Sequence, residues 1–450
     1  MAIIIALSFL LFYGFKSYQE LKVRPNLPPV VYESAYEGEP SFNLKIASQG
    51  FGEEVFQDLK EELKNSNADF ITANLGEMKL EIYADGKLQK EIKVLSKGKD
   101  GSWWETPTGR YSVIGKEVNH FSSIGQVWMP WSVQFYGNFF IHGWPQYSDG
   151  KLVSKEYSGG CIRLSTEDAK EVYDFTRRNT PVIVYDQEVR PVIFEKLKPL
   201  KNELSVLRIS SEAAFVLDLE TGNVLLNKNA DEVLSIASLT KLMTAVVASE
   251  LVYLERSIVM TPEMLLAKIQ SFSFEIGKSY RAFDLLYPLL MQSSNGAASA
   301  LSSFLGNNFF VRQMNEKTAS LDMKQTNFVD SSGESAKNIS TLKDLGKLAK
   351  YILEKRSFIF DISRGKNYPF FGENVFKDIK NYNEFYDLPN LIGVKNGETD
   401  AARQTILTIW QLRNNDGKSR KIMIGILSSL DRKKDVQNIL DWLKDNFGLK

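Results

Sequence analysis

The pattern of apolar and polar positions predicts a helix and then strands in the first part of the chain. Residues 36–67 are polar and helix-favouring, most clearly over Glu53–Asn65. After residue 70, apolar and polar positions alternate in two runs, 78–82 and 92–94, on either side of the turn-forming pair Asp85-Gly86. Alternation with a period of two around an Asp-Gly pair predicts a β-hairpin.

Strand-favouring residues dominate the chain up to Ile141. Ser165, with the acidic Asp168 three residues later, predicts the N-cap of a helix, and Pro181–Tyr185 predicts a closing strand. We therefore expect a mainly β domain over residues 68–187. The next segment, 188–203, is charged and contains two prolines, which predicts a semi-rigid linker.

The pattern changes again in residues 204–450, where strands stand at both ends and helices lie between them. The predicted elements are a hairpin, an interrupted helical stretch, two strands and a final helix, at 213–226, 238–355, 404–412, 421–428 and 432–447. Such an order indicates an antiparallel sheet covered by helices, an α+β arrangement. The sequence thus predicts two domains, the first mainly β and the second α+β.

The chain begins with an apolar run. Residues 2–15 carry no charge, but these 14 residues are fewer than the roughly 20 that span a bilayer. We expect residues 1–23 to be a hydrophobic anchor or a signal, followed by a linker or helical region at 24–67. The basic residues Lys16, Lys22 and Arg24 follow the run, which by itself favours a cytoplasmic body.

Composition narrows the possible chemistry. Lys+Arg and Asp+Glu each number 55 among 450 residues, so the chain has no net charge, and it lacks the basic stripe of a nucleic-acid binder. There is one cysteine, Cys161, and there are two histidines, His120 and His142. An intrachain disulfide is therefore excluded, a His/Cys zinc cage nearly so, and we expect neither a metal nor an organic cofactor.

The single cysteine lies in a glycine-rich segment that can support nucleophilic catalysis. A cysteine nucleophile needs a base to form the thiolate and backbone amides to hold the oxyanion. His142 can be the base, and Gly160 lets the backbone approach a substrate carbonyl. Arg163 brings a positive charge that favours the thiolate or holds a carboxylate. The alternative is that Cys161 and His142 are structural core residues.

These residues resemble the motif of the L,D-transpeptidase family. That motif is a histidine, some fifteen residues, then Ser/Thr-His-Gly-Cys and an Asn or Arg two positions on. Here fifteen residues separate His142 from Ser158, and Cys161 and Arg163 fall in register. The resemblance covers roughly 70–187. It implies that Cys161 is the nucleophile, His142 its base, and that Ser158, Gly160 and Arg163 meet the substrate.

Two further positions bear on this resemblance. Residues 106–111, Thr-Pro-Thr-Gly-Arg-Tyr, are similar to the Thr-Pro-Thr-Gly stretch of the family. Gly159 departs from the motif, because it stands where the family has its second histidine. The departure puts a supporting contact in doubt rather than the nucleophile.

A second candidate nucleophile, Ser238, begins a helical pattern. Ser238 and Lys241 lie three residues apart, which places both side chains on one side of a helix. A serine hydroxyl becomes a nucleophile when a base takes its proton, and a lysine can be that base if its pKa is lowered. A Ser-x-x-Lys pair is weak evidence alone, but Ser293-Ser294-Asn295 and Lys395-Asn396-Gly397 follow in the order found in penicillin-binding proteins and class A β-lactamases.

The sequence around these motifs is similar to that of the D-alanyl-D-alanine carboxypeptidase family, over about residues 210–447. The resemblance implies that Ser238 is acylated and that Lys241 is its base. Ser293 and Asn295 would relay protons and hold the substrate amide, and Lys395 would attract the terminal carboxylate. Asn396 departs from the usual threonine of the Lys-Thr-Gly motif that ends in Gly397. A class A β-lactamase is disfavoured because no clear Glu-x-x-x-Asn element lies between the second and third motifs.

Both families act on bacterial peptidoglycan stem peptides. The resemblance implies a D,D-carboxypeptidase that removes the last D-alanine of a pentapeptide stem, and an L,D-transpeptidase that cross-links the resulting tetrapeptide. It also implies covalent inhibition by β-lactams and a place in the cell envelope outside the cytoplasm. Two alternatives stay open: a hydrolytic pair, D,D-endopeptidase plus L,D-carboxypeptidase, and a wall-binding scaffold with an inactive site.

Overall fold

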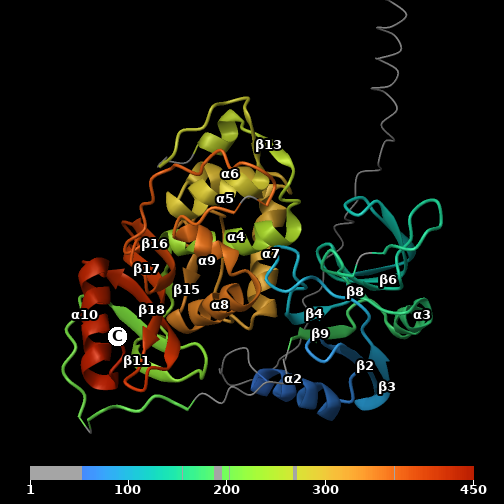
Figure 1. Ribbon diagram of the computed structural model, residues 1–450, viewed down its shortest axis with the longest axis horizontal. Helices are drawn as coiled ribbons and strands as arrows, with labels where there is room; N and C mark the ends of the chain where they lie inside the picture. Colours follow the sequence, from blue (N-terminus) through green and yellow to red (C-terminus); the bar gives the residue numbers. More distant parts are fainter. Residues whose placement is uncertain (1–52, 155, 187–194, 202, 267–270, 369) are drawn as a thin grey trace, which may run out of the picture. The chain divides into compact units, whose positions relative to one another are not determined.

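The computed structural model describes residues 53–450 apart from 155, 187–194, 202, 267–270 and 369 (Figure 1). The predicted anchor or signal at 1–23 lies outside the described residues. Among the helices that are described, none is long and apolar enough to cross a membrane.

The first domain starts with the predicted helix, α2 (Glu53–Asn65), and the predicted hairpin. Both turn residues of the hairpin, Asp85 and Gly86, have positive φ angles, of 49° and 71°. This is the backbone of a two-residue turn whose twist matches that of the strands. The hairpin belongs to a five-stranded sheet with the order β3 (Lys87–Lys93), β2 (Lys79–Ala84), β1 (Phe70–Asn74), β9 (Pro181–Tyr185) and β4 (Gly109–Ser112).

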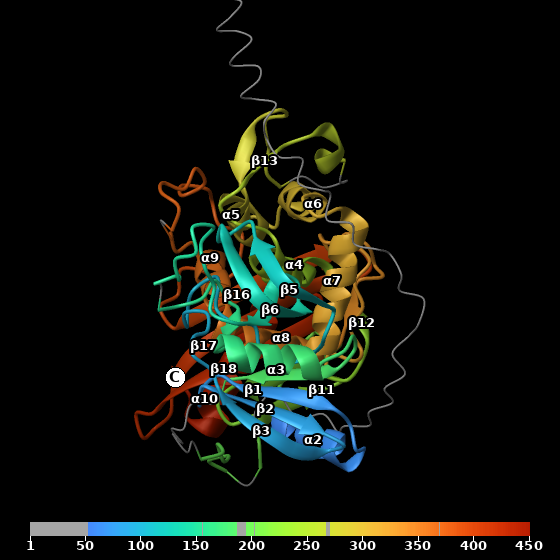
Figure 2. The ribbon, with the colours of Figure 1, turned by 90° about the vertical axis from the view of Figure 1, so that its right-hand side faces the viewer.

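A second, four-stranded sheet of the first domain contains β5 (Gly115–Ser122), β6 (Val127–Tyr136), β7 (Phe139–His142) and β8 (Ile162–Arg163), in that order. Helix α3 (Thr166–Phe175) follows β8, and Figure 2 shows it between the strands of the two sheets. Its N-cap is Ser165, as predicted, because the hydroxyl accepts a hydrogen bond from the amide of Asp168 at 3.0 Å. The mainly β character of this domain is confirmed.

The second domain is built on an antiparallel sheet made from both ends of the segment, as predicted. Its order is β11 (Val224–Lys228), β10 (Ala213–Asp218), β18 (Ser419–Ser429), β17 (Arg403–Arg413) and β16 (Leu391–Thr399). Alternate residues of β18 point to opposite faces. Ile422 and Ile424 pack with α10 (Arg432–Phe447), whereas Met423 belongs to the core on the other face.

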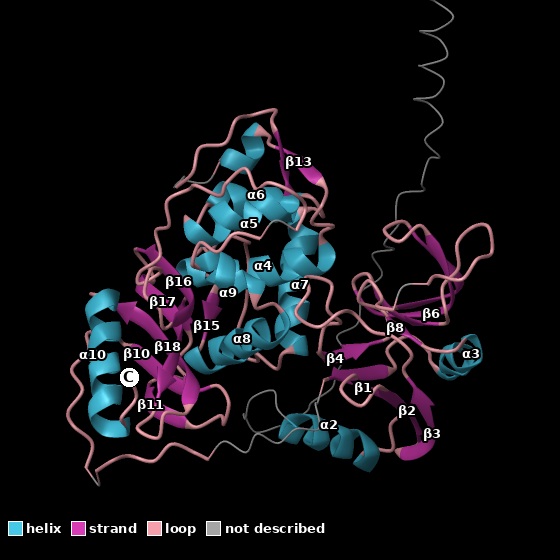
Figure 3. Ribbon diagram, in the orientation of Figure 1, coloured by secondary structure: helices cyan, strands magenta, loops and turns pink. Residues whose placement is uncertain are grey.

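Helices cover both faces of this sheet, with α10 on one side and the other helices on the opposite side (Figure 3). Two short pairs of strands lie among the helices of the larger group. In one, β12 (Leu234–Ser235) pairs with β15 (Ile339–Ser340), and in the other β13 (Ser257–Val259) pairs with β14 (Ser279–Arg281). The helices of this group are α4 (Thr240–Leu251), α5 (Ala282–Met291), α6 (Asn295–Ser303), α7 (Asn307–Ser320), α8 (Leu342–Lys355) and α9 (Phe358–Ser363).

The two domains share one continuous apolar core, which the sequence did not indicate. Trp103 of the first domain packs on Tyr253 and Phe371 of the second, with ring centroids 6.4 Å and 5.7 Å apart. A fully buried ionic cluster lies at the same junction: Glu250 pairs with Lys317 at 2.9 Å and with Arg356 at 3.1 Å. The linker prediction alone suggested two tethered bodies, but within the described residues their surfaces are packed together.

Candidate active sites

The predicted cysteine-site residues meet because β7 and β8 pair in parallel. The register places Ile141 beside Ile162 and His142 beside Arg163, so Cys161, one residue before β8, lies beside Phe140. Side chains alternate between the faces of a sheet. Ile141 and Ile162 point into the core, and Cys161, His142 and Arg163 therefore share the other face.

The imidazole of His142 is oriented by the backbone of the next residue. Its Nδ1 lies 2.6 Å from the carbonyl oxygen of Gly143. Because a carbonyl only accepts, Nδ1 carries the proton and Nε2 keeps a lone pair, which is the tautomer required of a base. Burial lowers the pKa of His142 to about 3, so the resting imidazole is neutral.

The Cys161 thiol is enclosed. It packs with Val127, Met129, Phe140 and Val153, and its Sγ lies 3.8 Å from the carbonyl oxygen of Asn138, to which it donates weakly. Burial raises the pKa of Cys161 to about 11. The positive charge of Arg163 acts in the expected direction, lowering this pKa, but burial outweighs it. The resting pair is thus a neutral thiol, which donates weakly to Asn138, and a neutral imidazole.

The turn before Cys161 is closed by Ser158. The Ser158 hydroxyl donates to the carbonyl of Cys161 and accepts from the amide of Gly160 at 3.0 Å. Gly160 has a φ of 108°, and a Cβ there would lie 2.3 Å from the ring of Phe139. At Gly159, by contrast, a Cβ would meet nothing within 4 Å. The guanidinium of Arg163 lies over the ring of Trp144, 5.5 Å from its centroid.

The second predicted nucleophile, Ser238, lies in a short 3₁₀ turn, Ala237–Leu239, directly before α4. The sequence predicts that Ser238 lies on the helix itself, and the structure corrects this by one short turn. The preceding residue, Ala237, has a φ of 46°, an uncommon conformation for a residue with a side chain. Lys241 follows in the first turn of α4, and its Nζ lies 2.9 Å from the Oγ of Ser238. The amine is therefore within reach of the hydroxyl proton.

Lys241 is fully buried and surrounded by oxygen acceptors. Its Nζ donates to Oδ1 of Asn295 at 2.7 Å and to the carbonyl of Ser332. Burial lowers the pKa of Lys241 to about 7, against the opposing charges of Asp330 and Glu334. A large neutral fraction at physiological pH is what a general base needs.

The other two serine-site motifs meet at the edge strand β16. Lys395 on β16 donates to the Oγ of Ser293 at 3.0 Å and to the carbonyl of Asn396. Burial lowers the pKa of Lys395 well below its usual value, and the neighbouring charge of Lys241 acts in the same direction. Ser293, just before α6, has a φ of 59°. At Gly397, a Cβ would lie 2.6 Å from the amide nitrogen of Ser238, so only glycine lets β16 approach the nucleophile this closely.

Asn396, the departure from the usual threonine, is tied to a loop. Its Nδ2 donates to the carbonyl of Tyr382 at 3.2 Å, and its backbone amide donates to Oδ1 of Asn383 at 3.4 Å. The side-chain amide is thus already engaged, which limits its use for a substrate carboxylate.

The structure adds three residues that the motifs did not identify. The carbonyl of Ser332 holds Lys241, and Asp330 shapes this loop by accepting from the amides of Ser332 and Gly333 at 2.8 Å and 2.6 Å. A Cβ at Gly333 would lie 1.9 Å from the carbonyl oxygen of Ala237. One sequence signal lies beside them: residues 326–330, Thr-Asn-Phe-Val-Asp, are also similar to the carboxypeptidase family, and they end at Asp330.

Comparisons with known proteins find matches to both domains of the chain. A family model described as "D-alanyl-D-alanine carboxypeptidase" matches residues 200–417, and one described as "L,D-transpeptidase catalytic domain" matches residues 68–184. The carboxypeptidase DacB2 of Mycobacterium tuberculosis is 30% identical over 197 residues, which are 43% of this chain and 67% of that protein. The chain belongs to the D-alanyl-D-alanine carboxypeptidase family and carries an L,D-transpeptidase catalytic domain in front.

Other relatives match smaller parts. A D-alanyl-D-alanine endopeptidase of Pseudomonas aeruginosa is 38% identical over 160 residues, 33% of this chain and 48% of that protein. The chain thus spans about half the length of this endopeptidase. The putative L,D-transpeptidase YkuD of Bacillus subtilis is 36% identical over 81 residues, 18% of this chain and 45% of that protein. A solved D-alanyl-D-alanine carboxypeptidase of M. tuberculosis has 25% identity and a TM-score of 0.47, covering 55% of this chain and 95% of that one.

The two adjacent glycines of the L,D-transpeptidase motif provide a matched test of the turn before Cys161. Gly160→Ala should lower the free energy of unfolding by about 2 kcal/mol, because the new Cβ meets Phe139 and the φ angle is unfavourable. Gly159→Ala should change it by about 0.5 kcal/mol or less. Urea denaturation measures both. Equal losses for the two variants would contradict the described turn.

The carboxypeptidase site should show the titration of Lys241. Acylation of Ser238 by a fluorescent penicillin should rise about tenfold between pH 6 and pH 8, because the neutral amine becomes the main form as the pH passes the Lys241 pKa of about 7. The rate is measured in the Cys161→Ala variant, in reactions that are stopped at set times at a fixed penicillin concentration. A rate that is constant or falls over this range would rule out Lys241 as the base.

Proposed function

We propose that the protein is a bifunctional peptidoglycan enzyme, with a serine D,D-carboxypeptidase site at Ser238 and a cysteine L,D-transpeptidase site at Cys161. The observation that carries the proposal is the contact of Lys241 with both Ser238 and Asn295, at 2.9 Å and 2.7 Å. The same chain also has an oriented His142 on the same sheet face as Cys161. Neither step requires a metal or an organic cofactor.

At the serine site, neutral Lys241 takes the proton of Ser238 as Oγ attacks the carbonyl of the penultimate D-alanine. The bond to the terminal D-alanine breaks, and its amine leaves with a proton returned from the site, for which Ser293, hydrogen-bonded to Lys395, is the candidate relay. Water then attacks the acyl-enzyme, and the stem is released as a tetrapeptide. Lys395, when protonated, is placed to attract the terminal carboxylate.

At the cysteine site, the thiol of Cys161 gives its proton to Nε2 of His142 as Sγ attacks the carbonyl of the third residue of the tetrapeptide. The terminal D-alanine leaves as an amine that takes the proton back. An amino group of a neighbouring stem then attacks the thioester and forms a 3,3-type cross-link, which frees the thiol. The product of the serine site is thus the donor for the cysteine site.

A second candidate is a hydrolytic pair, a D,D-endopeptidase with an L,D-carboxypeptidase. Its support is that relatives from P. aeruginosa and Escherichia coli, each 38% identical over their matches, are named D-alanyl-D-alanine endopeptidases. Both alternatives use the same acyl-enzymes and differ in the acceptor, amine or water. Either one places the enzyme outside the cytoplasm of a bacterium, in contact with the wall, and makes both nucleophiles targets of β-lactams.

Single variants separate the two sites. On a wall rich in pentapeptides, Cys161→Ala should still release D-alanine but form no 3,3-type cross-links. Ser238→Ala should do neither, yet it should cross-link a tetrapeptide wall at close to the wild-type rate. Loss of a nucleophile typically lowers the rate by several orders of magnitude. Muropeptide analysis by mass spectrometry measures both D-alanine release and 3,3-type cross-linking for each variant. Cross-linking by Cys161→Ala would rule out the cysteine assignment.

Asn396 offers a test of the serine pocket. Asn396→Thr should raise acylation of Ser238 roughly three- to tenfold, because a hydroxyl that can donate to the substrate carboxylate replaces an amide held by Tyr382. The matched control is Asn396→Ala, which also removes the contact with Tyr382 but adds no donor, and it should not be faster than the wild type. A threonine variant no faster than the wild type would show that the pocket is adapted to asparagine.

A further inference from the structure

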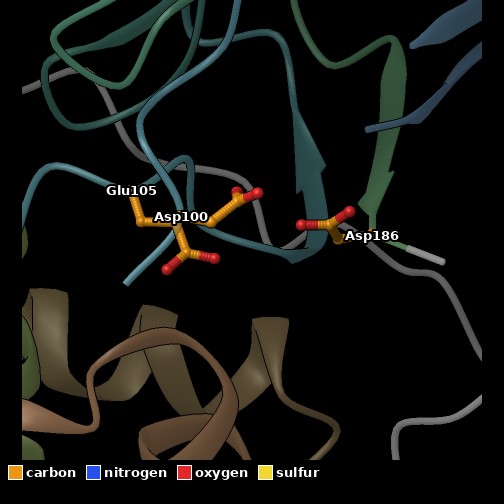
Figure 4. Close-up of side chains that lie close together, drawn as sticks. All are labelled: Asp100, Glu105 and Asp186. Atoms are coloured by element: carbon orange, nitrogen blue, oxygen red, sulfur yellow. The ribbon is translucent and has the colours of Figure 1, made fainter. Parts of the chain in front are cut away.

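A chain of alternating charges joins the two domains on the side of the cysteine site. Asp100 pairs with Lys97 at 2.8 Å, Lys97 with Asp186 at 3.1 Å, Asp186 with Lys355 at 2.7 Å, and Lys355 with Glu105 at 2.7 Å. Lys355, at the end of α8, is the member from the carboxypeptidase domain. The three carboxylates lie close together in Figure 4, and the two lysines between them offset two of the three negative charges.

Lys355 and its neighbour Arg356 bind the side chain and the backbone of Glu105, respectively. The Lys355 ammonium binds the carboxylate, and the Arg356 guanidinium donates to the backbone carbonyl of Glu105 at 3.0 Å. The Lys355 side chain is 10% exposed and that of Glu105 is 3% exposed, so water screens this contact little. Burial by itself would lower the pKa of Lys355, but its two carboxylate partners raise it, and the ammonium stays charged.

The segment held in this way forms one wall of the Cys161 turn. Next to Glu105, the hydroxyl of Thr106 accepts from the amide of Gly98 at 2.9 Å. Gly98 forms a β-bridge with Ser158, whose amide donates to the carbonyl of Lys97 at 2.9 Å. Three contacts therefore lead from the carboxypeptidase domain to the serine that closes the nucleophile turn.

A second route is steric. The carbonyl oxygen of Trp104, the residue before Glu105, would lie 3.0 Å from a Cβ at Gly160. The backbone of the 97–106 segment thus packs directly on the glycine before Cys161. Any shift of Glu105 moves the surface against which the nucleophile turn is built.

We propose that Lys355 is a positioning residue for the cysteine site, so that the L,D-transpeptidase domain is fully active only while the carboxypeptidase domain is packed against it. Lys355 fixes the 97–106 segment through Glu105, and this segment fixes the turn that presents Cys161. The inference deepens the proposed function of the Cys161 site and rests on it for the acylation readout, but the positioning itself can be tested separately.

The test uses the full chain and compares two lysines of the same helix. Lys355→Met removes the ammonium and keeps the length of the side chain. Lys350→Met is the matched control, because among the described residues Lys350 forms an ion pair only with Glu354 of α8 itself, at 3.9 Å. Lys355→Arg keeps the charge. For each variant, saturation kinetics with a carbapenem give the binding constant and the limiting acylation rate of Cys161, and a fluorescent penicillin reports on Ser238.

Lys355→Met should lower the limiting acylation rate of Cys161 at least tenfold while changing carbapenem binding and Ser238 labelling less than twofold. Lys355→Arg should recover most of the rate, and Lys350→Met should match the wild type. Adding Glu105→Gln to Lys355→Met should cost less than Glu105→Gln alone, because the contact is already lost. An unchanged Cys161 rate in Lys355→Met, or an equal loss at both nucleophiles, would overturn the proposal.

A readout independent of catalysis separates this proposal from the proposed function. Cys161 is only 9% exposed, so a loosened turn should make its thiol more accessible. Iodoacetamide alkylation, followed by intact mass, should be at least tenfold faster in Lys355→Met than in the wild type or Lys350→Met. If the carbapenem fails to acylate wild-type Cys161, the proposed function fails, and the alkylation rates alone decide the positioning role. Equal alkylation rates would then overturn it.

Discussion

The buried guanidinium of Arg356 constrains the rest of the structure. A fully buried charge must be paired and hydrogen-bonded, and removal of one partner of a buried pair typically costs about 3–5 kcal/mol. Arg356 finds its partners on both sides of the domain junction: the carboxylate of Glu250 and the backbone carbonyl of Glu105. Glu250 stands near the end of α4, the helix whose first turn holds Lys241 beside Ser238. The scaffolds of both candidate sites are thus attached to one side chain. If the domains separated, Arg356 would keep its pair with Glu250 but lose the hydrogen bond to Glu105.

Burial has opposite consequences at the two nucleophiles. At the serine site it lowers the pKa of Lys241 to about 7, so that a base is available before any substrate arrives. At the cysteine site it raises the pKa of Cys161 to about 11 and lowers that of His142 to about 3, so that the thiol is protected in the resting state. A neutral enclosed thiol resists oxidation. The serine site thus holds a partly neutral base at rest, whereas the cysteine site rests as a neutral thiol beside a neutral imidazole.

Much of this arrangement can be predicted from the sequence, and there is a physical reason why the rest cannot. Period-two and helical patterns, the Asp85-Gly86 turn and the Ser165 cap fix the local elements, because each is a short-range effect. The Ser238-Lys241 contact is predicted from the three-residue spacing of a helix, and the 3₁₀ turn before α4 also brings the two side chains together. The Ser332 carbonyl that holds Lys241, and the charge chain through Lys355, join residues far apart in the chain and carry no periodic signal. The shared core of the two domains is hidden for the same reason, since apolar residues at a junction have the pattern of any buried face.

The most direct test of the account is a time course of muropeptides formed by the wild-type protein on a wall that contains only pentapeptide stems. If the Ser238 site supplies the donor for the Cys161 site, free tetrapeptide should accumulate first and 3,3-type cross-links should follow after a lag. Added tetrapeptide should abolish that lag. Cross-links that form without a tetrapeptide stage, or a loss of existing cross-links with no new ones formed, would contradict the account, and the second result would favour the hydrolytic pair.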